Sequence, residues 1–202
     1  MKVLCLDLEG VLVPEVWQAV AASTGIEGLN RTTRDIPVYD ELMSYRLDLL
    51  KQHDLTMSLI QAEIDKLSPL AGAVEFIEWA RERFQVAIIS DTFYEFAAPL
   101  MRKLGQPLLL CHHLSVENDR IQAYHIRQPD PKRRCVQAFK SLQFRVLAAG
   151  DSYNDVTMLE EADHGFFYAA PDNVTADYPQ YESTRTYQEL QQALIRVDDQ
   201  LV

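Results

Sequence analysis

The sequence is short of the features that mark secreted, disulfide-bonded and membrane proteins. Its 202 residues include only three cysteines, an odd number at scattered positions that has neither a disulfide framework nor metal-ligand spacing. No run approaches the ~20 apolar residues of a membrane span, and Asp7 interrupts the apolar start that a secretory signal needs. We therefore expect a cytoplasmic protein with no membrane partner, in which Cys5 and Cys111 are small core residues.

Basic residues are also scarce. Lysine and arginine number 19 against 30 acidic residues, which gives a net charge of −11 and argues against a nucleic-acid partner or an anionic membrane surface. A small anionic substrate remains compatible, because a metal ion and a few cations can reverse the field inside one cleft. The length and the 48% hydrophobic content suit one main domain with a substantial core.

Short apolar runs alternate with helical patterns along most of the chain. Each run is too short for a helix and is typical of a strand buried in a parallel sheet. The predicted strands are 3–6, 85–89, 107–111, 146–149 and 164–169. Two further segments, 114–117 and 121–126, flank Asn118-Asp119-Arg120 and predict a β-hairpin. The predicted fold class is therefore α/β, with a Rossmann-like doubly wound parallel sheet.

The intervening segments show helical periodicity. Helices are predicted over 69–84 and 93–104, and a last one begins at Thr186, which forms a capping box with Glu189. Three more patterns, 16–24, 39–51 and 56–67, lie between the first strand and Pro69, with a loop over 25–37. This stretch predicts a small helical unit beside the main sheet.

Two carboxylates follow the first strand. Asp7 and Glu9 are spaced i and i+2 at the carboxyl end of that strand, the edge at which open α/β sheets bind ligands. Two acids beside a buried strand are costly unless a cation or a proton accompanies them. Ser90 follows the second strand, although taken alone it is better explained as a helix N-cap.

Further polar groups follow later strands. Asp151, Asn154 and Asp155 come directly after a buried strand and a glycine, and this pattern resembles a site for a hard cation. Lys132 begins a run of three cations at a helix start, where positive charge opposes the helix dipole. That run is either a solvated patch, or one of its members turns inward to an anion. Together these groups match the needs of phosphoryl transfer.

The set resembles the four motifs of the haloacid dehalogenase superfamily of phosphohydrolases, over essentially the whole chain. The resemblance implies a core domain at 1–13 and 69–202 and a helical cap at 14–68. It also implies that Asp7 attacks phosphorus to form an aspartyl phosphate and that Glu9 serves as the acid and base. The implied phosphate ligands are Ser90, Lys132 and Asn154; the implied Mg²⁺ ligands are Asp7, the backbone carbonyl of Glu9, Asp151 and Asp155.

More narrowly, the chain is similar to the phosphoserine phosphatase branch. Glu15 and Arg46 match the acid and the cap arginine that hold the ammonium and carboxylate groups in that branch. Without the resemblance, Glu15 suits the first turn of a helix and Arg46 suits a surface cation. The resemblance implies phosphoserine as substrate and homoserine as a second acceptor, and it is compatible with a homodimer.

Two departures from the branch leave the acceptor and the fine substrate preference open. Glu9 replaces the usual Asp, and Ser90-Asp91-Thr92 replaces the usual Ser-Gly-Gly. One alternative is a different small phosphomonoester, such as a sugar or nucleotide phosphate. Another is a receiver-type signalling module, which also gathers acids, a hydroxyl and a lysine. In that module, however, the phospho-accepting Asp ends a later strand, and no cap-sized insertion is expected.

Overall fold

A mostly parallel sheet forms the centre of the molecule. The structure is a computed structural model that describes residues 1–32, 35–36 and 38–198. Within these residues the sheet has seven strands in the order β4-β3-β2-β1-β5-β6-β7, and the pairs are parallel except for β3 with β4. The strands are β1 (Lys2–Leu6), β2 (Gln85–Phe93), β3 (Leu108–Glu117), β4 (Arg120–His125), β5 (Arg145–Gly150), β6 (His164–Tyr168) and β7 (Glu182–Thr184). The predicted α/β fold class is confirmed.

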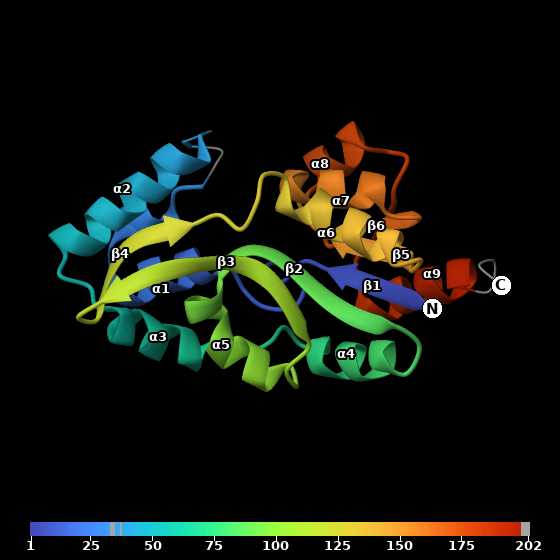
Figure 1. Cartoon of the computed structure of the whole chain (residues 1–202), viewed down its shortest axis with the longest axis horizontal. Coiled ribbons are helices and arrows are strands. Elements are labelled where there is room, and N and C mark those ends of the chain that lie inside the picture. Colours follow the sequence, from blue (N-terminus) through green and yellow to red (C-terminus); the bar gives the residue numbers. More distant parts are fainter. Residues whose placement is uncertain (33–34, 37, 199–202) are drawn as a thin grey trace.

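Helices cover both faces of the sheet (Figure 1). One layer contains α4 (Ala73–Arg81), α5 (Tyr94–Lys103) and α9 (Tyr187–Asp198). The other contains α6 (Pro131–Ser141), α7 (Val156–Glu161) and α8 (Asp172–Asp177). The alternation of β1 explains why both layers form: Leu4 and Leu6 pack with the first layer, whereas Val3 and Cys5 pack with the second. All three cysteines are buried and free, as the sequence predicts for Cys5 and Cys111.

The segment between β1 and α4 is helical. It contains α1 (Val16–Thr24), the 3₁₀-helix η1 (Glu27–Asn30), α2 (Tyr39–Gln52) and α3 (Met57–Lys66). In this segment α3 packs against α1 and α5, and α2 packs against β4. Figure 1 shows α1, α2 and α3 around the β3–β4 hairpin. The cap was predicted over this segment. Residues 33, 34 and 37 of its loop, and 199–202 of the predicted core, lie outside the described residues.

Several element boundaries differ from prediction. The second strand runs on to Phe93, so Ser90 lies inside β2 and caps no helix; Phe93 is buried and pairs with His112 after an irregularity in register. The predicted third strand and the first arm of the hairpin are one continuous strand, β3. The helix expected from residue 69 begins at Ala73, after Gly72 in a left-handed conformation. Both α8 and β7 were missed because such short elements carry little periodicity.

The last helix begins with the predicted capping box. Thr186 Oγ1 accepts from the Glu189 N–H at 3.2 Å, and Glu189 Oε2 accepts from the Thr186 N–H at 3.2 Å. In the part of the chain that the structure describes, no helix has the length and apolar character needed to cross a membrane.

Candidate active site

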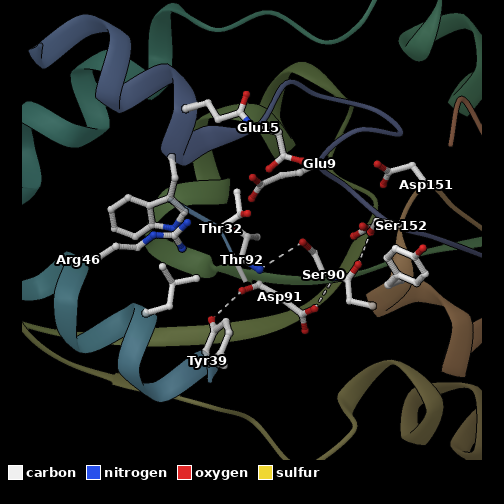
Figure 2. Close-up of a pocket in the computed structure, with 16 residues that line it drawn as sticks. Glu9, Glu15, Thr32, Tyr39, Arg46, Ser90, Asp91, Thr92, Asp151 and Ser152 are labelled. Carbon is white, nitrogen blue, oxygen red and sulfur yellow. Dashed lines mark hydrogen bonds between the residues drawn. The ribbon is translucent and has the colours of Figure 1, made fainter. Parts of the chain in front are cut away.

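A pocket of about 370 Å³ lies at the carboxyl ends of β1, β2 and β5, beside α1 and α2. Its lining includes seven of the predicted site residues: Asp7, Glu9, Glu15, Arg46, Ser90, Asp151 and Asn154. The other two, Lys132 and Asp155, are buried behind the pocket and contact Asp7 and the Asp151 loop. Figure 2 shows the pocket-lining side chains gathered between the helices of the 14–68 segment and the strand ends. The structure thus brings all nine residues together.

Asp7 continues the line of β1. Its backbone N–H donates to the carbonyl of Ala149 at 3.0 Å, so the ladder with β5 holds it at the strand end. Asp7 Oδ1 accepts from the N–H of Leu8 at 2.7 Å, and Oδ2 lies 3.0 Å from Lys132 Nζ. The residue is 5% exposed. Its carboxylate is therefore fixed by the backbone on one side and by a cation on the other.

Lys132 turns inward from the first turn of α6. It is 2% exposed, and its Nζ lies 2.6 Å from Asp155 Oδ1 and 3.8 Å from Asp91 Oδ2. Burial alone would lower the pKa of Lys132, but Asp155, Asp7 and Asp91 hold that pKa well above its usual value. Arg133, the next cation, instead pairs with the surface residue Glu160 at 2.6 Å. One member of the predicted cationic run therefore points into the protein, and the solvated-patch alternative fails for Lys132.

Asp155 organises the loop after β5. It is fully buried, and its Oδ2 accepts from the N–H groups of Asp151 at 2.9 Å and Ser152 at 3.0 Å. Gly150 is required here, because a Cβ at that position would lie 2.3 Å from Asp155 Cγ. Since Asp155 also accepts from Lys132, both of its oxygens are engaged within the protein. Asp155 thus holds the Asp151 backbone and Lys132 in place.

The carboxylates of Asp7, Asp151 and Asp155 suit a hard cation. Each offers an oxygen, and these atoms lie within 4.8 Å of one another. Burial and the charge of Asp155 raise the pKa of Asp151 to about 7 and hold the pKa of Asp7 above its usual range. At Gly10, whose φ is +78°, a Cβ would lie 2.5 Å from Asp151 Oδ2. Asp7 and Asp151 line the pocket, whereas Asp155 is fully buried behind it, so Asp7 and Asp151 are better placed than Asp155 to bind such a cation.

Glu9 joins β1 to α1. Its Oε2 accepts from the N–H of Val16 at 2.9 Å, at the start of the helix. Burial, followed by the charge of Glu15, raises the pKa of Glu9 to about 7, although hydrogen bonds from Val16 and Thr92 act in the opposite direction. A carboxyl group that titrates near neutral pH can both donate and accept a proton there.

Arg46 is buried rather than exposed at the surface. It is 8% exposed, its guanidinium lies 4.6 Å above the ring of Trp17, and its Nη2 donates to the carbonyl of Arg31 at 2.8 Å. Burial lowers the pKa of Arg46 to about 10, so the group stays charged at neutral pH. Its buried Nε has no hydrogen-bond partner among the described residues. Glu15, at the N-cap of α1, is exposed and lines the same pocket.

Nine of the residues that line the pocket were not predicted as site residues, and Tyr39, Trp17 and Asp91 are among them. Tyr39 and Trp17 were seen only as residues of helical segments, and their place in the pocket depends on how α1 and α2 pack. Asp91 carried a signal, since it is one of the departures in Ser90-Asp91-Thr92. Its carboxylate accepts from Asn154 Nδ2 at 2.8 Å. The change is visible in the sequence, but the contacts of Asp91 are visible only in the structure.

Comparisons with known proteins agree with the fold and identify the family. The chain matches the family model of the haloacid dehalogenase-like hydrolases over residues 1–163. It is 58% identical to a phosphoserine phosphatase of Pseudomonas syringae pv. tomato, covering 98% of this chain and 84% of that protein. It is 57% identical to phosphoserine phosphatase ThrH of Pseudomonas aeruginosa, covering 97% of this chain and 96% of that protein.

A solved structure shares the fold at low sequence identity. It is described as a phospho-aspartyl intermediate analogue of phosphoserine phosphatase, and its superposition has a TM-score of 0.80. The match is 19% identical and covers 95% of this chain and 98% of that one.

Proposed function

The chain belongs to the haloacid dehalogenase-like hydrolase family, and from this we propose that it is a Mg²⁺-dependent phosphoserine phosphatase with Asp7 as its nucleophile. The observation that carries the proposal is the buried Asp7 carboxylate, 3.0 Å from Lys132 Nζ and beside Asp151, in a pocket that Arg46 also lines. The names of the two relatives above support phosphoserine as the substrate.

The first half of the reaction breaks the ester bond. A carboxylate oxygen of Asp7 attacks phosphorus, and the bond from phosphorus to the serine oxygen breaks. Glu9, in its protonated form, gives its proton to that oxygen, so serine leaves as an alcohol. The phosphoryl oxygens meet the hydroxyl of Ser90, the ammonium group of Lys132 and the amide of Asn154.

The second half discharges the aspartyl phosphate. Glu9, now ionised, takes a proton from the acceptor hydroxyl as the acceptor oxygen attacks phosphorus, and the Asp7 carboxylate is released. With water as acceptor the product is inorganic phosphate. With homoserine as acceptor the product is phosphohomoserine. We propose both outcomes, because a site that holds the amino-acid end of serine can hold homoserine, which is one methylene longer.

A metal ion completes the proposed site. Asp7, Asp151 and the Glu9 carbonyl would hold it, with Asp155 close by, and the bound Mg²⁺ would neutralise charge on the phosphoryl oxygens. The chemistry of the donors supports this, because several carboxylates face a single lysine and a divalent cation would balance their charge.

Arg46 and Glu15 give the proposed pocket its preference for an amino acid. The guanidinium of Arg46 offers donors to the substrate carboxylate, and its unpartnered Nε is one of them. The exposed carboxylate of Glu15 suits the substrate ammonium group. A phosphorylated sugar or nucleotide lacks this pair of charged groups and is the weaker candidate.

The test is a phosphatase screen over phosphorylated amino acids, sugars and nucleotides, with and without Mg²⁺. We expect phosphoserine to give the largest kcat/KM, and EDTA to abolish the activity until Mg²⁺ is restored. A preference for a sugar or nucleotide phosphate would overturn the substrate. Full activity in metal-free protein would overturn the metal.

A further inference from the structure

Asp91 is a charged pocket residue that the proposed reaction does not use. It lies in β2 directly after Ser90, and its contacts come from several parts of the fold. Its Oδ2 accepts from Asn154 Nδ2 at 2.8 Å and lies 3.8 Å from Lys132 Nζ. Its backbone carbonyl accepts from the Tyr39 hydroxyl at 3.4 Å. Figure 2 shows Asp91 between Tyr39 and Ser152.

The bond to Asp91 sets the orientation of Asn154. Asn154 Oδ1 accepts from the Ser152 hydroxyl, and its Nδ2 donates to Asp91. The two partners therefore distinguish the two ends of the amide, which could otherwise rotate because Asn154 is exposed. An amide nitrogen carries two N–H groups, so one remains for a phosphoryl oxygen.

Asp91 is itself held in its charged form. His112, which is 2% exposed, accepts from the Arg127 N–H at its Nδ1 at 3.2 Å, so its Nε2 carries the proton. That Nε2 lies 3.6 Å from Asp91 Oδ1. Burial alone would raise the pKa of Asp91, but Lys132, His112 and Asn154 together hold that pKa well below its usual range.

We propose that Asp91 is a positioning residue for phosphate binding, which holds the Asn154 amide and the Lys132 ammonium group toward the phosphoryl oxygens. This inference rests on the proposed function only in that the pocket binds a phosphoryl group. The direction in which phosphate affinity changes distinguishes a positioning role from a purely electrostatic one. A carboxylate that acted only through its charge would repel the phosphate, so removing it would tighten phosphate binding. A positioning carboxylate has the opposite effect: its removal weakens binding.

The experiment measures the affinity of the Mg²⁺-loaded protein for inorganic phosphate by calorimetry. Asp91→Ala removes both contacts, and we expect it to weaken phosphate binding about tenfold, the usual size for a charge-assisted hydrogen bond. Asp91→Asn is the conservative variant, since its carbonyl oxygen can still accept from Asn154, and we expect it to restore part of the loss. Unchanged or tighter binding in Asp91→Ala would overturn the proposal.

A double-mutant cycle tests the route through Asn154. If Asp91 acts largely through that amide, Asp91→Ala should weaken binding much less in an Asn154→Ala background than in the wild type. Equal effects in the two backgrounds would overturn that route. Asp54→Ala is the matched control, because it removes a carboxylate from an ion pair with Arg120 at 2.6 Å that lies outside the pocket lining. It should leave phosphate affinity unchanged.

Thermal unfolding shows whether the Asp91→Ala variant folds. If it does not, Asp91→Ser replaces it, because serine is polar but too short to reach Asn154. We expect the same loss of phosphate affinity from Asp91→Ser. Phosphate affinity does not depend on which ester the enzyme hydrolyses. Failure of phosphoserine turnover would therefore count against the proposed substrate and leave the role of Asp91 to be judged by binding.

Discussion

The carboxylate of Glu9 accepts a 2.9 Å hydrogen bond from the backbone N–H of Val16, so the proposed proton donor also binds the first turn of α1. The same turn follows Glu15 and carries Trp17, which stacks on Arg46. The position of the Glu9 carboxylate is thus coupled to the helix beside Glu15 and Arg46, the proposed amino-acid-binding groups. The usual Asp at this position is one methylene shorter than Glu9.

Shortening Glu9 should change the fate of the phosphoryl group. Asp in its place reaches less far toward Val16, so its carboxylate would sit differently relative to phosphorus. We expect Glu9→Asp to shift the ratio of products from phosphohomoserine toward inorganic phosphate when homoserine is supplied. Phosphorus NMR of the reaction mixture measures both products.

The wild-type mixture provides the control for that experiment. Water is present at ~55 M, so homoserine competes only if the site positions its hydroxyl, and effective molarities from positioning can far exceed that value. Inorganic phosphate as the sole product at saturating homoserine would contradict the transferase activity and leave the phosphatase.

Arg46→Ala should separate substrate recognition from catalysis. Loss of its charge-assisted contacts to the substrate carboxylate should raise KM for phosphoserine by about 10- to 100-fold. The KM for p-nitrophenyl phosphate, which has no carboxylate, should change far less. Arg83→Ala is a suitable control, because it removes a similar stack on Trp79 that lies outside the pocket lining. An equal rise in KM for both substrates would show that Arg46 supports the fold instead.

The metal-free protein should become less stable as pH rises toward 7, because the fold raises the pKa of two pocket carboxyl groups. In the fold, the pKa values of Glu9 and Asp151 are each raised to about 7, from 4.5 and 3.8. At pH values between the unfolded-state and native-state pKa of each group, the native state binds more protons than the unfolded state. The free energy of unfolding therefore falls as pH rises toward 7. We expect metal-free protein to melt at a higher temperature at pH 5.5 than at pH 8. Calorimetric scans test this, and a Tm that rises with pH would contradict it.

Magnesium should reduce that pH dependence. An ion bound by Asp7 and Asp151 favours their charged forms and stabilises the native state by mass action. Adding Mg²⁺ should therefore raise Tm more at pH 8 than at pH 5.5. Asp151→Asn should remove most of this effect. A Mg²⁺ response that Asp151→Asn leaves unchanged would place the metal elsewhere.

Strand-end residues made much of the site predictable. Asp7 and Asp151 follow buried strands, and the carboxyl ends of parallel strands meet at one edge, so their proximity follows from the pattern. The inward turn of Lys132 could not be read from local sequence, because the neighbouring Arg133 is also a cation at the same helix start. Only the packing of α6 decides which of them is buried. The role of Asp91 likewise depends on its contacts with α2, β3 and the Asp151 loop, which come from distant segments.

Trapping the phosphoryl group on the enzyme tests most directly whether Asp7 is the nucleophile. Wild-type protein and Asp7→Asn are each mixed with Mg²⁺ and with phosphoserine that carries a radioactive phosphorus. The reactions are quenched in acid within the first turnover. We expect label on the wild-type peptide that contains Asp7 and none on the variant. Asp7→Asn should retain less than about a hundredth of wild-type turnover, because an amide is not a nucleophile. Substantial turnover by Asp7→Asn, or label on another residue, would contradict that role for Asp7.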